Sequence, residues 1–188
     1  ENIMIRVDRL LTWIVLGWFA GTAGLAYSSE APRDPYKFFF NESFGDYKEE
    51  LENAKQQGKK AVLVFFEQDE CPFCHRMKTT IMNQPNVQQY FRERFLLFAH
   101  DIEGDLEIVD FEGNQTTQKD YAVKVQRVRA TPVIAFFDLD GKRITRYIGA
   151  TPTAQEFKWL ADFVADGHYK NTSFTKYKRE RKKSERAG

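Results

Sequence analysis

The chain has 188 residues, a formal net charge of +1 and a high aromatic content in which phenylalanine dominates. This length predicts one domain with tails, and the phenylalanines supply enough apolar surface for a hydrophobic core. A net charge this close to zero argues against a general nucleic-acid-binding protein, so no nucleic-acid partner is predicted.

Residues 1–26 carry the features of an export segment. Arg6 and Arg9 precede a charge-free run from Leu10 to Ala26, and small residues lie at the end of that run. This pattern predicts a cleaved signal peptide or an uncleaved membrane anchor. The shortness of the run and its glycine content favour cleavage. An exported chain would work in an oxidising compartment.

Residues 27–45 are predicted to form a linker whose aromatic end, Phe38–Phe40, docks on the domain. The domain itself is expected to span residues 46–167. It begins with a helix that Asp46 caps and Gly58 ends. A buried strand follows at residues 61–67, because that run is apolar and rich in β-branched or aromatic side chains.

Cys71 and Cys74 are the two cysteines of the chain. Cys74 shares a helical spacing with Met77 and Ile81, so the motif lies between the buried strand and the start of a helix. A strand that leads C-x-x-C into a helix is the thioredoxin-type redox arrangement. The helix N-terminus favours the thiolate of the first cysteine, and the second cysteine, one turn later, can attack a mixed disulfide.

The same motif allows other interpretations. The run from Cys71 to His75 also matches C-x-x-C-H, the attachment pattern of c-type haem, which needs a second axial ligand and an enclosing apolar shell. A closed zinc site wants four ligands, so no metal site is predicted. A purely structural disulfide would close too small a loop to restrain the unfolded chain. A redox-active dithiol that needs no further cofactor is therefore the leading interpretation.

The second half of the predicted domain alternates helices and strands. The expected elements are a short helix at 87–94, a strand at 95–99, an inserted hairpin or lid-like loop at 102–116, a helix that Thr117 caps, and strands at 133–137 and 144–148. Asp140-Gly141 is the hairpin signal between the last two strands. The last helix is expected to be capped by Thr151, with Pro152 at its first position, and to end at Gly167.

This order of elements gives the thioredoxin architecture, an α/β fold with a central mixed sheet flanked by helices on both faces. Thr131 and Pro132 stand directly before the strand at 133–137, a place where proline is sterically tolerated. In a thioredoxin fold this proline is cis and lies against the C-x-x-C pair, and its preceding residue offers backbone groups to an extended substrate. Thr131 and Pro132 are therefore predicted to bind substrate.

Residues 168–188 are predicted to form a disordered basic tail. Eight Lys or Arg and two Glu lie between Lys170 and Arg186. A charge run of this kind is usually solvated. The alternative is that it binds anionic lipid or an acidic partner.

Four segments together resemble the SoxW-type periplasmic thioredoxins of sulfur-oxidising bacteria. They are Phe66–Gln68, Cys71–Cys74, Val109–Gly113 and Ala130–Pro132, within a match over about residues 38–166. The insertion at Val109–Gly113 is the most selective of them. The resemblance implies a periplasmic thiol–disulfide oxidoreductase that reduces disulfide-containing proteins of the sulfur-oxidation system. It also implies electrons supplied by a membrane thiol transporter, and we expect a monomer.

The chain departs from cytoplasmic thioredoxins at the site. Phe65 stands where they have a buried aspartate, and the dipeptide Pro72-Phe73 is closer to that of glutaredoxins. Glu67 is the nearest carboxylate on the strand, either a proton acceptor for the dithiol or a solvated strand end. His75 either tunes the thiolate or is a solvated side chain. The motif does not fix the redox direction, so a disulfide oxidase or isomerase is the alternative function.

Overall fold

The computed structural model describes residues 30–187, and the predicted export segment at residues 1–26 lies outside them. Four strands form the central sheet in the order β2-β1-β5-β6. They are β1 (Ala61–Glu67), β2 (Phe95–Asp101), β5 (Val133–Phe137) and β6 (Arg143–Ile148). β1 runs parallel to β2 and antiparallel to β5, so the sheet is mixed, as the sequence predicted. The two central strands are buried along their whole length, which explains their continuous apolar sequences.

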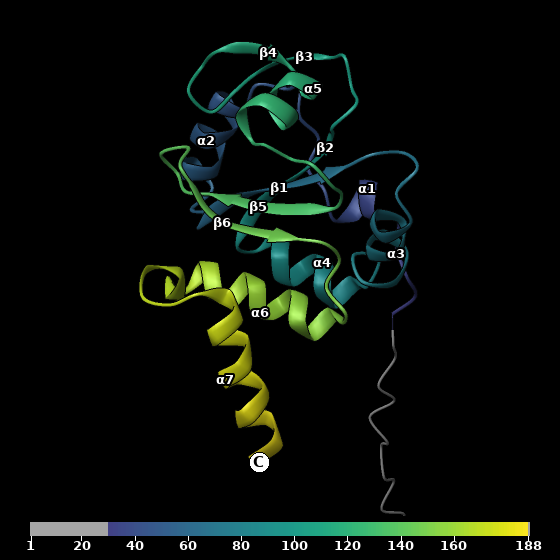
Figure 1. Cartoon of the computed structure of the whole chain (residues 1–188), viewed down its shortest axis with the longest axis vertical. Helices are drawn as coiled ribbons and strands as arrows, with labels where there is room; N and C mark the ends of the chain where they lie inside the picture. The colour runs from purple at the N-terminus through teal and green to yellow at the C-terminus, as the bar shows by residue number, and fades with distance from the viewer. Residues whose placement is uncertain (1–29, 188) are drawn as a thin grey trace, which may run out of the picture.

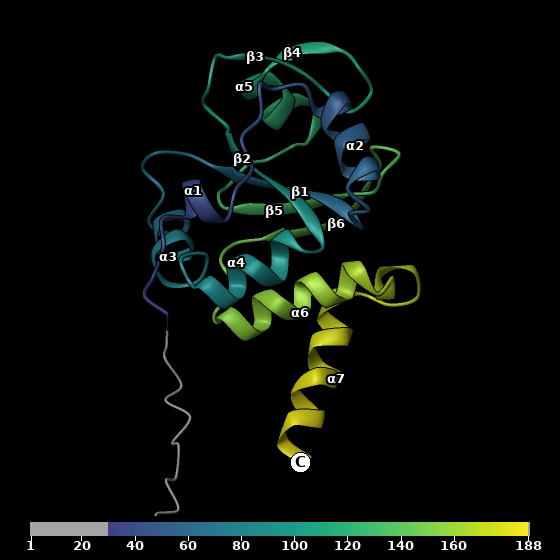
Figure 2. The same cartoon turned by 180° about the vertical axis from the view of Figure 1, so that it is seen from behind.

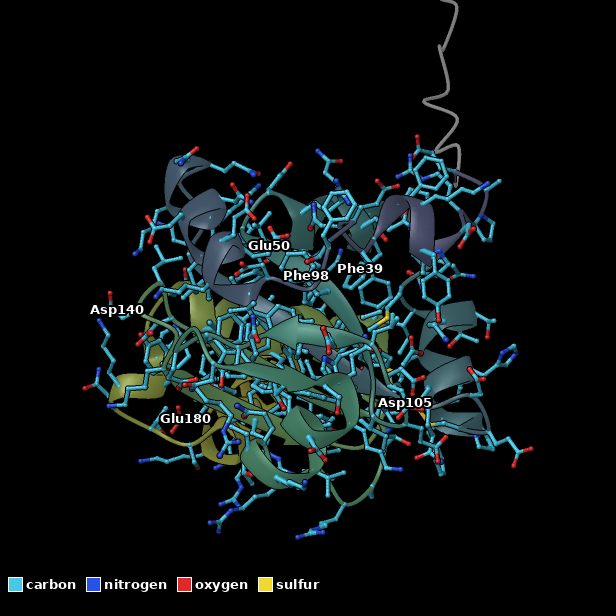
Figure 3. All side chains as sticks on the ribbon, turned by 90° about the horizontal axis from the view of Figure 1, so that it is seen from above. Phe39, Glu50, Phe98, Asp105, Asp140 and Glu180 are labelled. Carbon is cyan, nitrogen blue, oxygen red and sulfur yellow. A yellow bond between two sulfur atoms is a disulfide. The ribbon has the colours of Figure 1, made fainter. Side chains whose placement is uncertain are left out.

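Helices cover both faces of this sheet (Figures 1 and 2). One face carries α3 (Pro72–Thr80), α4 (Pro85–Arg92) and α6 (Ala154–Ala165), whose side chains share a core with Leu63 and Phe65. The opposite face carries α2 (Tyr47–Gln56), the short α5 (Gln118–Asp120) and a π-helical turn at Tyr121–Val125. Figure 3 shows the labelled Phe39 and Phe98 in the interior, with Asp140 and Glu180 at the periphery.

The N-caps of the helices are the residues that the sequence predicts, with one exception. The side chains of Asp46 and Thr117 accept hydrogen bonds from the amides three residues on, as predicted. The predicted cap Thr151 is wrong, because α6 begins at Ala154 and Thr153 accepts the hydrogen bond from the Glu156 amide. Thr153 and Glu156 have the spacing of a capping box, which favours the later start. Thr151 is fully buried before the helix.

The predicted insertion before the third helix of the fold is a small hairpin. β3 (Glu107–Val109) and β4 (Gln115–Thr117) pair in an antiparallel register. The buried Asp110 closes the turn, since its carboxylate accepts the backbone N–H groups of Glu112 and Asn114. The Val109 amide donates to the Gly45 carbonyl at 2.9 Å, which ties the hairpin to the segment before α2.

Residues 30–45 form an N-terminal strap that crosses the domain and contains α1 (Pro35–Phe38). Phe39 and Phe40 are buried in the core of the α4 and α6 face, so the predicted aromatic docking is present in the structure. Asn41 pairs with the edge strand β2, because its amide donates to the Leu97 carbonyl and its side-chain oxygen accepts from the Leu97 amide.

The predicted disorder of residues 168–188 is wrong for the residues that the structure describes. His168–Lys170 forms a 3₁₀ turn and Phe174–Ala187 forms the helix α7, which leaves the body of the domain at α6 (Figure 1). Tyr177 is buried against Phe163 of α6. Across residues 30–187, no helix is long and apolar enough to cross a membrane.

Candidate active site

The two cysteines form a disulfide at the start of α3, with their Cα atoms 5.2 Å apart. Cys71 is the N-cap of the helix, and its sulfur accepts a hydrogen bond from the Cys74 amide at 3.1 Å. Cys71 is 6% exposed and Cys74 is 1% exposed. Because the Cys71 sulfur lies at the helix N-terminus and accepts from the Cys74 amide, the same position would favour a thiolate after reduction.

The residues next to the disulfide present an apolar surface and an exposed histidine. Phe73 is 61% exposed, and Pro72 is exposed beside it. His75 is also exposed, and its side chain lines a cavity of about 410 Å³ together with Tyr36 and Lys78. The sulfurs are joined to each other and His75 lies open to solvent. This arrangement suits thiol exchange better than haem attachment.

Thr131 and Pro132 lie at the same end of the sheet as the disulfide. Val133 pairs with Phe66, so Pro132 is placed beside the carboxyl end of β1, from which the chain continues to Cys71. The Thr131–Pro132 peptide bond is cis. The Thr131 hydroxyl donates to the Gln68 side-chain oxygen at 3.1 Å, which links this segment to the loop that carries the cysteines.

Glu67 is held in a cluster with Tyr36 and Lys78. The Lys78 ammonium lies 2.6 Å from the Glu67 carboxylate, the Tyr36 hydroxyl donates to that carboxylate at 2.8 Å, and Lys78 also donates to the Tyr36 oxygen. Burial acts to lower the pKa of Lys78, but its bonds to Glu67 and Tyr36 raise the pKa above its ordinary value. Glu67 is buried, so it is not a solvated strand end.

Sequence reasoning missed three residues that shape this site. Tyr36 comes from the strap, 31 residues before Glu67, and no local pattern joins them. Lys78 lies one helical turn after Cys74, a spacing that could have placed it on the strand side of α3. Arg76 donates to the Thr151 carbonyl and fastens α3 to the segment before α6.

The family model of the thioredoxin-like domain matches residues 47–165. The chain belongs to this family. Its matched part has the fold, the Cys71–Cys74 pair and the proline segment described above. The predicted fold class, a thioredoxin fold with a mixed central sheet, is confirmed.

Several known proteins are similar to this chain. Over 107 residues the thioredoxin-like chain is 27% identical to a disulfide bond reductase, DsbH, of Chlamydia pneumoniae, covering 56% of this chain and 62% of that protein's length. A thioredoxin-fold protein of Helicobacter pylori is 25% identical with a TM-score of 0.56, covering 70% of this chain and 88% of its own. A Thermus thermophilus thioredoxin, 24% identical with a TM-score of 0.50 over 65% and 86% of the two chains, shares the fold.

Proposed function

We propose that the protein is a periplasmic thiol–disulfide oxidoreductase that reduces disulfides of partner proteins. One observation carries the proposal: a closely spaced cysteine pair begins a helix, and the Cys74 amide in its first turn donates to the Cys71 sulfur. The printed name of the Chlamydia pneumoniae relative, a disulfide bond reductase, supports the reductive direction. Disulfide oxidation or isomerisation by the same cysteines is the alternative.

The proposed reaction moves two electrons from the dithiol to the substrate. The Cys71 thiolate attacks one sulfur of the substrate disulfide, forms a mixed disulfide and releases the other substrate sulfur as a thiolate. The Cys74 thiol then loses its proton and attacks the Cys71 sulfur. This second step releases the substrate's second thiolate and leaves the Cys71–Cys74 disulfide seen in the structure.

Thr131 and Pro132 would bind the substrate segment beside the sulfurs, since they lie at the same end of the sheet and are linked to the cysteine loop through Gln68. Glu67 would accept the proton of the Cys74 thiol, and His75 would tune the thiolate from the exposed side of α3. No further cofactor takes part in this scheme.

The cycle needs a reductant for the disulfide, and we propose a membrane thiol transporter as its source. The resemblance to SoxW-type thioredoxins supports partners in a sulfur-oxidation system. Export by the segment at residues 1–26 would bring the domain to the periplasm.

The equilibrium reduction potential of the purified protein tests the direction. A reductase should equilibrate near the thioredoxin value of about −270 mV, whereas an oxidase should lie near about −120 mV. Turnover is measured as the precipitation of insulin after its disulfides are cut, with dithiothreitol as electron donor. Cys71→Ser should reduce this rate to the uncatalysed level. An equal rate in that variant would contradict the proposal.

A further inference from the structure

The outer edge of strand β2 is open at Ala99, near the carboxyl end of the strand. Leu97 directs its backbone groups away from β1, since both of them bond to Asn41 of the strap. Backbone groups alternate along a strand, so Ala99, two residues on, directs its N–H and C=O to the same side. Within residues 30–187, no hydrogen-bonding partner meets these two groups.

A cavity of about 440 Å³ lies over this open edge. The strap leaves β2 after Asn41 and rejoins the domain at Gly45, where it bonds to the β3–β4 hairpin, and the cavity occupies the space between. Phe40 and Ile108 supply buried apolar walls. Phe44 is fully exposed and Leu106 is 71% exposed at its border. Exposed large apolar side chains grouped at a cavity are typical of a binding surface.

The charge of the cavity border limits what can bind there. Glu42 and Glu107 line it and are exposed, and among the described residues no lysine or arginine lines it. An unpaired strand edge forms hydrogen bonds with the backbone of an extended peptide, and apolar walls contact every second side chain of that peptide. Carboxylates on the border favour lysine or arginine in the bound segment.

Tyr36 connects the wall of this cavity with the cluster around Glu67. Its side chain lines this cavity and also the smaller one beside His75, and its hydroxyl binds Glu67 at the end of β1. A segment bound at β2 would therefore lie on the strap side of the disulfide, away from Thr131 and Pro132.

We propose that this cavity binds an extended, apolar and basic segment of an unfolded protein substrate, which adds to β2 at Ala99. The proposal rests on the proposed function, because it gives the oxidoreductase a second contact with polypeptide substrates. It explains how such a protein would prefer a disulfide within an unfolded chain to the same bond in a small molecule.

Hydrogen exchange of single amides tests the binding mode on the full chain. The probe is reduced, carboxamidomethylated α-lactalbumin, an unfolded polypeptide with no free thiol or disulfide. The Ala99 amide should exchange rapidly in the protein alone and at least roughly tenfold more slowly with saturating probe. The Phe98 amide, which faces β1, is the internal control and should not change. Protection of Ala99 without probe would overturn the proposal, because another part of the chain would then cover the edge.

Surface substitutions test the same cavity without threatening the fold. Leu106→Asp and Phe44→Asp should each weaken probe binding roughly tenfold, because each removes the burial of one large apolar side chain, a loss larger than the attraction of one exposed carboxylate for a basic residue. Val125→Asp is the matched control, since Val125 is exposed but does not line the cavity. Equal affinity in all three variants would overturn the proposal.

A kinetic ratio separates this inference from the proposed function. The ratio of kcat/KM for insulin to kcat/KM for oxidised glutathione should fall roughly tenfold in Leu106→Asp. It should keep the wild-type value in Val125→Asp. If the wild-type protein reduces neither substrate, the proposed function fails, and probe binding still decides the cavity by itself. An unchanged ratio in Leu106→Asp would overturn the second contact while leaving the reductase in place.

Discussion

Cys71 and Cys74 differ in their surroundings, and this difference assigns their roles. Cys71 is the more exposed of the two and receives the Cys74 amide, while Cys74 is almost fully buried in the core that both share with Met77. Cys74→Ser should therefore accumulate mixed disulfides through Cys71, because the resolving thiol is gone. Non-reducing gels of periplasmic extracts, followed by mass spectrometry, measure this. Equal trapping by Cys71→Ser would reverse the two roles.

His100 is a buried neutral histidine on the face of the sheet opposite to the cysteines. Its Nε2 donates to the Gln118 carbonyl, so its Nδ1 accepts from the Tyr47 hydroxyl at 2.7 Å. Burial lowers the pKa of His100 to about 4, although the bond to Gln118 and the charge of Asp101 act to raise it.

This lowered pKa predicts a loss of stability in mild acid. The unfolded chain binds a proton at this ring below about pH 6.5, whereas the folded chain binds one only near pH 4. The free energy of unfolding should therefore fall by about 1.4 kcal/mol per pH unit as the pH drops through that window. His100→Gln should flatten this dependence, as measured by urea unfolding at several pH values. His75→Gln, at an exposed histidine, is the control and should keep the wild-type slope.

At the scale of elements, the sequence predicts the helices, strands and turns whose signals lie within a few neighbouring residues. The apolar run at β1, the C-x-x-C helix start, the Asp46 cap and the Asp140-Gly141 hairpin each carry their signal within a few residues, and the structure contains all of them. The sequence places the start of α6 two residues too early, because Thr151 and Thr153 are both possible caps. The capping-box spacing of Thr153 and Glu156 and the burial of Thr151 favour the later start.

The elements that depend on distant partners were not predictable in the same way. The cluster of Tyr36, Glu67 and Lys78 joins the strap, β1 and α3. The sequence predicts a solvated tail for the basic run of α7, but Lys178 and Lys182 both pair with Glu156 of α6. A sequence shows the charges of α7 without showing the carboxylate that they meet.

Glu156 provides a test of how α7 is attached. Burial acts to raise the pKa of this carboxyl, but Lys182 and Lys178 lower it below its ordinary value. The attachment is therefore present above the unfolded carboxyl's pKa and weakens as the pH falls through the folded value. Glu156→Gln should loosen α7 by about 1 kcal/mol, because two partly exposed ion pairs contribute little each.

Amide hydrogen exchange of α7 measures this loosening, with the amides of β1 as a reference that should not change. Glu180→Gln on the exposed side of α7 is the matched control. Faster exchange throughout the sheet in Glu156→Gln would contradict a local attachment, because it would mean that α7 supports the whole fold.

At the scale of the molecule, the folding unit extends beyond the domain predicted at residues 46–167. Two cores lie on opposite faces of one sheet, and the strap contributes Phe39 and Phe40 to the core that also holds Cys74. Phe39 contacts the rings of Phe91 and Phe157, which belong to α4 and α6 on this face. The strap is therefore part of the core rather than a linker.

This placement predicts that a core substitution in the strap lowers the free energy of unfolding strongly, whereas removal of α7 leaves the domain folded. Phe39→Ala should lower the free energy of unfolding by about 3–5 kcal/mol, a large part of the roughly 5–15 kcal/mol that a domain has. Phe44→Ala, a few residues away in the same strap, is fully exposed and should change it by less than about 0.5 kcal/mol. Urea unfolding followed by circular dichroism measures both. Truncation after Gly167 should leave a folded domain of lower stability, since Tyr177 is the one buried side chain of α7. If Phe39→Ala were as stable as Phe44→Ala, the strap would be a linker after all, and the position of Tyr36 beside Glu67 would have to be explained without it.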